Sequence, residues 1–166
     1  PSRGLGDVYK RQIQSITYEK LNDEFSTDIF TVDALRGKLG INAIESKKSL
    51  YDLVVLDSMG VEKNFAESLE REDDVVVYTK LPRGFYINTP MGKYNPDWAV
   101  AFREGSVKHV YFVAETKGND LLSSQIRSSE KSKITCAMRH FDTISDGSLI
   151  YSVVKDYQSL YDVVRK

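Results

Sequence analysis

Short apolar runs separated by polar segments recur along this chain, and the clearest pair predicts two antiparallel strands. Residues 98–102 and 110–114 are apolar, whereas residues 103–109 between them are polar and include Gly105. Such a pattern is typical of a hairpin. If the hairpin centres on Ser106, Asp97 and Glu115 lie equally far from it along the chain. They would then stand opposite each other, with Cβ atoms about 4.5–5.5 Å apart.

Other segments have the spacing of helices. Val61, Phe65 and Leu69 recur at i, i+4 and i+8, which predicts a helix capped at position 57 or 58 and ended by the acidic pair at 73–74. A short helix is expected over residues 31–39. A longer helix is expected over residues 121–139, with an apolar stripe made of Leu122, Ile126, Ile134, Ala137 and Met138.

Further strands are expected where apolar and β-branched residues cluster, over residues 51–56, 75–78, 85–88 and 149–154. A turn is expected at 89–92, directly after the strand over residues 85–88. Helices and strands in this order predict an α/β fold, with a short mixed β-sheet flanked by helices.

Charge and composition narrow the possible functions. The 23 basic and 24 acidic residues leave a net charge of −1, so no overall electrostatic attraction pulls the chain to DNA. The lone Cys136 permits no internal disulfide and no zinc cluster. No apolar stretch reaches about 18 residues, so we expect no membrane span. A reducing, cytoplasmic setting is expected.

Candidate chemistry gathers at the predicted hairpin. Lys117 shares a strand face with Glu115, because side chains two residues apart point the same way. Two carboxylates and an ammonium would then meet at one edge of the sheet, and oxygen ligands so placed suit Mg²⁺. A Pro-Asp pair is also common in turns, and Glu-x-Lys is usually a solvated pair. Opposed carboxylates repel each other without a cation, which favours the metal site.

These residues resemble the PD-(D/E)xK nuclease superfamily. More closely, the chain resembles the C-terminal endonuclease region of the restriction subunit of type III restriction enzymes, over roughly residues 50–141. The longest stretch of resemblance is Thr89-Pro90-Met91-Gly92-Lys93-Tyr94-Asn95-Pro96-Asp97-Trp98, and Glu115-Thr116-Lys117-Gly118 follows it. The resemblance implies a restriction-endonuclease-like core and Mg²⁺-dependent hydrolysis of double-stranded DNA.

The resemblance also assigns roles. Asp97, Glu115 and the backbone carbonyl of Thr116 would bind the metal, and Lys117 would orient the attacking water or offset charge on phosphorus. Glu62, on the first predicted helix, is the candidate third acid; the alternative is a solvated carboxylate. Candidate DNA contacts are Lys93, Tyr94, Arg127, Lys131 and Lys133. The alternative for the last three, which share the helix predicted over 121–139, is a charged face that only contacts solvent. Trp98 is expected in the core.

The chain is expected to contain three segments, and the resemblance suggests partners. Residues 1–12 resemble a translated sequencing adapter, residues 13–49 are expected to form a linker or subdomain from an upstream region, and residues 50–166 the nuclease domain. No Gly-x-x-x-x-Gly-Lys motif is present, so ATP would enter only through an upstream translocase of the prokaryotic enzyme. A DNA methyltransferase is the expected partner. One alternative is another PD-(D/E)xK nuclease, such as a DNA-repair or junction nuclease. The other is a catalytically idle domain that holds DNA or serves assembly.

Overall fold

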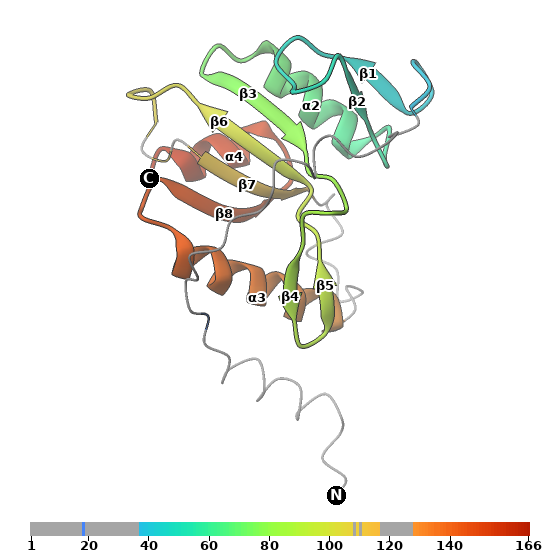
Figure 1. The fold of residues 1–166 in the computed structure, drawn as a ribbon. Coiled ribbons are helices and arrows are strands. Elements are labelled where there is room, and N and C mark those ends of the chain that lie inside the picture. Colours follow the sequence, from blue (N-terminus) through green and yellow to red (C-terminus); the bar gives the residue numbers. More distant parts are fainter. Residues whose placement is uncertain (1–17, 19–36, 108, 110, 117–127) are drawn as a thin grey trace, which may run out of the picture.

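The computed structural model describes Tyr18, residues 37–107, His109, and residues 111–116 and 128–166 (Figure 1). Along these residues the elements are β1 (Ala43–Glu45), β2 (Leu53–Val55), α2 (Val61–Arg71), β3 (Val75–Lys80), β4 (Ile87–Thr89), β5 (Gly92–Tyr94), β6 (Trp98–Phe102), β7 (Tyr111–Thr116), α3 (Ser128–Ile144), β8 (Leu149–Val154) and α4 (Tyr157–Val164). The predicted helix over 31–39 lies almost wholly outside the described residues. Its last residue, Leu39, forms an isolated bridge with Ala43.

A mixed sheet with strand order β3-β6-β7-β8 forms the centre of the fold. The β6–β7 pairs run from Trp98 with Ala114 to Ala101 with Tyr111, and each pair is equidistant in sequence from Ser106. The predicted hairpin register is therefore confirmed. β3 pairs with β6 antiparallel, and β8 pairs with β7 in parallel. The predicted α/β fold with a short mixed sheet is also confirmed.

Helices cover both faces of this sheet (Figure 1). On one face, α2 and α4 pack over a core that includes Phe65, Trp98 and Leu160. On the other face, α3 and the β4–β5 hairpin pack over a second core that includes Ile134, Phe141 and Tyr151. Successive residues of a strand point to opposite faces, so β6 and β7 contribute side chains to both layers.

The helix predicted from Val61, Phe65 and Leu69 is α2, and Phe65 and Leu69 are fully buried. Its start differs from the prediction: the N-cap is Gly60, and no side chain caps it. The polar groups before the helix are instead engaged by Glu62, which accepts hydrogen bonds from the backbone N–H groups of Asp57 and Ser58.

Further differences lie in the described part of the chain, where β1 was not predicted. α3 extends to Ile144 and buries Ile134, Ala137 and Phe141, whereas Met138, predicted in the stripe, is 43% exposed. Residues 92–94 form β5 and not a loop, and they pair with β4 around a turn at 90–91. α4 was not predicted, although Asp156 and Ser159 form a capping box at its start.

In the described part of the chain, every helix is too short or too polar to cross a membrane.

Candidate active site

The predicted acids lie at one end of the central sheet, where β6 begins and β7 and β8 end. Asp97 directly precedes β6, and Glu115 is the penultimate residue of β7. Leu81, just past β3, donates its N–H to the carbonyl of Asp97, so β3 reaches this end as well. Asp97 donates its own N–H to the carbonyl of Ala114. The hairpin thus places both acids at the same end of the sheet.

Asp97 is held by the residue that follows Glu115. Its Oδ2 accepts hydrogen bonds from the backbone N–H of Thr116 at 2.8 Å and from the Thr116 hydroxyl at 2.9 Å. The Thr116 Oγ1 in turn accepts from Nε1 of the buried Trp98 at 3.2 Å. Trp98 packs against Phe65 and Tyr78, so the prediction that it belongs to the core is confirmed. A hydrogen-bond chain therefore runs from the core to Asp97.

Glu115 is held from the other layer. It is 4% exposed, and its Oε2 accepts a hydrogen bond from the Tyr94 hydroxyl at 2.6 Å. The Tyr94 hydroxyl also lies 2.5 Å from the hydroxyl of Tyr151, on β8. Burial, followed by the charge of Glu115, raises the pKa of Tyr94 far above its usual range. Tyr94 therefore stays protonated and able to donate.

Tyr151, on β8, was not among the predicted site residues, and no local sequence pattern links it to them. Burial is the largest cause of the raised pKa of the Tyr151 hydroxyl. The negative charges of Glu115 and Asp97 raise this pKa further. The charges of both acids therefore act on the same buried hydroxyl.

Glu62 is buried, and its hydrogen-bond partners are Lys80 and the backbone N–H groups of Asp57 and Ser58. Its two oxygens accept hydrogen bonds from the Lys80 ammonium at 2.9 and 2.8 Å. Lys80 also donates to Asp57 at 2.6 Å and pairs across the sheet with Trp98. The hydrogen bond from Lys80 is the largest cause that holds the pKa of Asp57 below its usual value. Glu62 thus fastens the start of α2 to the end of β3.

Among the candidate DNA contacts that the structure describes, the three lysines are exposed or half-buried, whereas Tyr94 is buried. Lys93 is exposed on β5, with its ammonium 3.7 Å from the ring centroid of Tyr86. Lys133 of α3 donates to the backbone carbonyl of Lys93 at 3.1 Å, so these two residues are neighbours. Lys131 is exposed on the same helix. Tyr94 differs from the prediction: it is 6% exposed and turned toward Glu115, so burial withdraws it from the surface that DNA would meet.

Two predicted residues, Lys117 and Arg127, lie outside the described residues. Among the residues that are described, no group of three or more His, Cys, Asp or Glu side chains is close enough to hold a metal ion. Any metal site built on Asp97 and Glu115 would therefore need other oxygen donors, such as the Thr116 carbonyl, bound water or a phosphate of the substrate.

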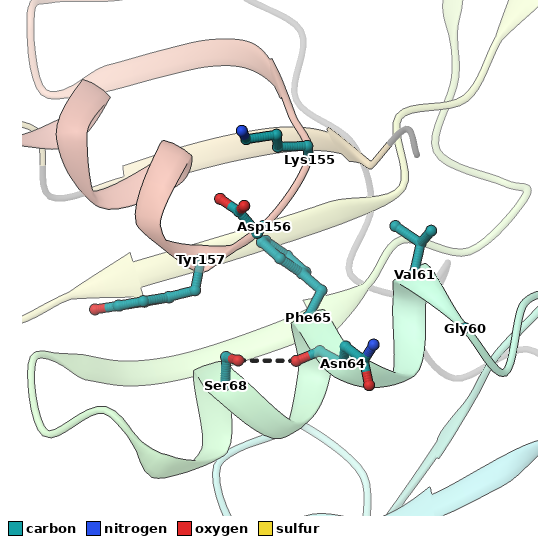
Figure 2. A pocket seen from close by; sticks show the side chains of 8 residues that line it. All are labelled: Gly60, Val61, Asn64, Phe65, Ser68, Lys155, Asp156 and Tyr157. Carbon is teal, nitrogen blue, oxygen red and sulfur yellow. Dashed lines mark hydrogen bonds between the residues drawn. The ribbon is translucent and has the colours of Figure 1, made fainter. Parts of the chain in front are cut away.

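A separate cleft of about 430 Å³ lies between α2 and the start of α4 (Figure 2). Phe65 and Tyr157 line it, and the Ser68 hydroxyl there donates to the carbonyl of Asn64. Asp156 also borders the cleft, but its carboxylate accepts the N–H of Ser159 in the capping box of α4. Neither Asp97 nor Glu115 lines this cleft. The convergent acids, and not the cleft, mark the candidate active site.

Fold and site together define an α/β domain in which a buried acid, Glu115, and a half-buried acid, Asp97, lie at one end of a mixed sheet. The chain belongs to the endonuclease domain family, whose model matches residues 47–157, more than half of the sequence. The matched segment contains Glu62, Asp97 and Glu115. Membership implies a nuclease that hydrolyses phosphodiester bonds in DNA. None of the curated proteins searched matches the chain.

Proposed function

We propose that the chain is the nuclease domain of a type III restriction subunit and hydrolyses double-stranded DNA with Mg²⁺. The observation that carries the proposal is the pair Asp97 and Glu115, buried or half-buried at one end of the sheet and each held by its own hydrogen-bond chain. The specific run of residues 89–98 supports the type III assignment over another PD-(D/E)xK nuclease.

The donor set at this end of the sheet fits a hard divalent cation. Mg²⁺ prefers oxygen ligands, and it commonly uses one or two carboxylates together with water and substrate phosphate. Asp97, Glu115 and the Thr116 carbonyl would hold the ion. A carboxylate that accepts hydrogen bonds on one oxygen still has lone pairs for a metal. When bound, the ion would neutralise phosphate charge and lower the pKa of water.

The protein's own groups would prepare this site. The Thr116 N–H and hydroxyl hold Asp97 in a single orientation, and Tyr94 does the same for Glu115. Lys117 would orient the attacking water and offset the negative charge that develops on phosphorus. Glu62 is better suited to anchoring Lys80, because both its oxygens already accept from that ammonium. A role for Glu62 as metal ligand would require Lys80 to move.

DNA would approach over β5 and α3. Lys93 and Lys133 lie together there, on the α3 side of the sheet that also carries Tyr94 and Glu115. Two or three cations neutralise few phosphates, and a net charge of −1 adds no general attraction. Tight binding would therefore depend on an upstream translocase driven by ATP and on a DNA methyltransferase partner.

The test is cleavage of supercoiled plasmid by the purified chain at low salt, where phosphate contacts bind DNA more strongly. We expect slow nicking that needs Mg²⁺, stops with EDTA and is lost in Asp97→Asn and Glu115→Gln. Asp73→Asn is the matched control, because Asp73 is an exposed acid outside the site. Nicking should also fall steeply as salt rises.

Three results would count against parts of this proposal. A folded wild-type chain that never cuts at low salt would favour an idle domain for holding DNA or for assembly. Cutting that survives Asp97→Asn would place the chemistry elsewhere. In a complete type III subunit, Lys117→Ala or Asp97→Ala should abolish cleavage and leave ATP hydrolysis intact. Loss of ATP hydrolysis in a folded variant would contradict a separate nuclease role.

A further inference from the structure

Two buried tyrosines from separate parts of the chain form a hydrogen-bond chain that ends at Glu115. Tyr94 lies at the end of β5 and Tyr151 on β8, and they are 6% and 5% exposed. Their rings meet edge to face, and Tyr151 also stacks on Phe141 of α3 at 5.2 Å between ring centroids. The two hydroxyls, 2.5 Å apart, thus meet inside a packed apolar layer.

The chain has one direction. A tyrosine hydroxyl carries a single proton, and an ionised carboxylate can only accept. Tyr94 donates its hydroxyl hydrogen bond to Glu115, so in its contact with Tyr151 it must accept the hydrogen bond that Tyr151 donates. Hydrogen bonds in series polarise one another in a medium of low dielectric constant, which strengthens the last bond in the series. Tyr151 therefore acts on Glu115 only through Tyr94.

Packing alone does not account for these hydroxyls. Phenylalanine would fill the same space against Phe141 and Ile134 without bringing a polar group into the core. A buried hydroxyl costs free energy unless it is hydrogen-bonded. The Tyr94 hydroxyl bonds the Glu115 carboxylate of the candidate active site, and the Tyr151 hydroxyl bonds that of Tyr94. Their common effect is to hold the Glu115 side chain in one place.

We propose that Tyr94 and Tyr151 are positioning residues that set the affinity of the Glu115 site for a divalent cation. The inference rests on the proposed function, because it takes Glu115 as a metal ligand. Tyr94 acts directly on the carboxylate, and Tyr151 acts through Tyr94. Partners that orient a metal ligand typically change metal affinity or activity by about 10–100-fold when they are replaced.

Calorimetric titration of Mg²⁺ into the full 166-residue chain tests this, with thermal unfolding measured on the same samples. Tyr94→Phe should weaken Mg²⁺ binding about 10–100-fold. Tyr151→Phe should weaken it less. The double variant should match Tyr94→Phe alone, because a residue that acts through another adds nothing once its intermediary is gone. In plasmid cleavage, each variant should need more Mg²⁺ and recover activity when Mg²⁺ is raised.

The matched control is Tyr78→Phe. Tyr78 is also a buried tyrosine that donates to a glutamate, Glu70, at 3.1 Å, but neither residue belongs to the acidic site. This variant should lose stability and keep the Mg²⁺ affinity of the wild type. An equal loss of affinity in Tyr78→Phe would reduce the effect to general destabilisation and overturn the proposal.

Other outcomes separate the two proposals. If the wild type binds Mg²⁺ and Tyr94→Phe binds it equally well, the tyrosines are only structural and the proposed nuclease site stands. Additive effects of the two tyrosine substitutions would overturn the serial arrangement. If the wild type binds no Mg²⁺ at all, both the metal site and the role of the tyrosines fail.

Discussion

Thr116→Val tests the hydrogen-bond chain that reaches Asp97 from the core. The substitution keeps the branched shape of the side chain and removes its oxygen, which now joins Trp98 to Asp97. The backbone N–H of residue 116 would still donate to Asp97. The change therefore removes two hydrogen bonds and leaves the main-chain path unaltered.

The expected magnitude follows from these two bonds. A hydrogen bond to a charged group contributes about 1.5–3 kcal/mol, and a buried donor left without a partner costs about 1–3 kcal/mol. Trp98 is fully buried, so no water replaces the acceptor that its Nε1 loses. Burial of the added valine methyl offsets about 1 kcal/mol of this. We expect Thr116→Val to lower the free energy of unfolding by about 2–4 kcal/mol.

Urea unfolding followed by circular dichroism measures this change, and the emission of Trp98, the one tryptophan of the chain, reports its surroundings. Thr116→Ser keeps the oxygen and should cost about 1 kcal/mol for the lost methyl. Thr79→Val is a second control, because the buried Thr79 hydroxyl donates to a neutral carbonyl, that of Lys80. A Thr116→Val variant as stable as Thr116→Ser or Thr79→Val would refute the reasoning.

Two further substitutions test the packing and the pH dependence of the fold. Leu160→Ala opens a cavity in the core beneath α4 and should cost about 2–5 kcal/mol in urea unfolding, whereas the exposed Gln158→Ala should change little. Glu70→Gln tests a carboxyl whose pKa burial acts to raise, but hydrogen bonds from Ser46 and the N–H of Lys47 leave it below its usual 4.5. Its folded pKa is the lower one, so its stabilisation is complete above about pH 4.5 and lost as pH falls through the folded pKa. The stability gap between Glu70→Gln and the wild type should therefore narrow in acid, and a gap independent of pH would contradict this assignment.

Neighbouring strands were predictable because their partners are close in sequence. The β6–β7 pairing follows from two apolar runs about one short loop, and it places Asp97 and Glu115 at the same end of the sheet, with Asp97 hydrogen-bonded to Thr116. The alternation of buried and half-buried residues along β6 agrees with one face toward each layer. The stripe of α2 was visible for the same reason, since helical periodicity is a local property.

Other features depended on packing that no local pattern contains. The Pro90-Met91 turn marked a change of direction, but it did not show that residues 92–94 return as a strand and turn Tyr94 inward. α4 is short, and only its capping box and the spacing of Leu160 and Val164 could have indicated it. Met138 has the right spacing from Ile134, yet the layer above β8 takes up Phe141 in its place.

The acidic site illustrates where sequence reasoning reaches its limit. Glu115 stands beside Val153 in the parallel pairing of β7 with β8, so Tyr151, two residues earlier, points to the same face as Glu115. That register cannot be read locally, because a crossover that contains α3 separates the two strands. The two acids belong to one hairpin, whose register can be predicted locally. The tyrosines do not: Tyr151 follows the long connection through α3, and Tyr94 belongs to the β4–β5 hairpin. A site of this kind is therefore recognised from its acids, whereas the contacts that fix the positions of those acids follow only from the assembled sheet.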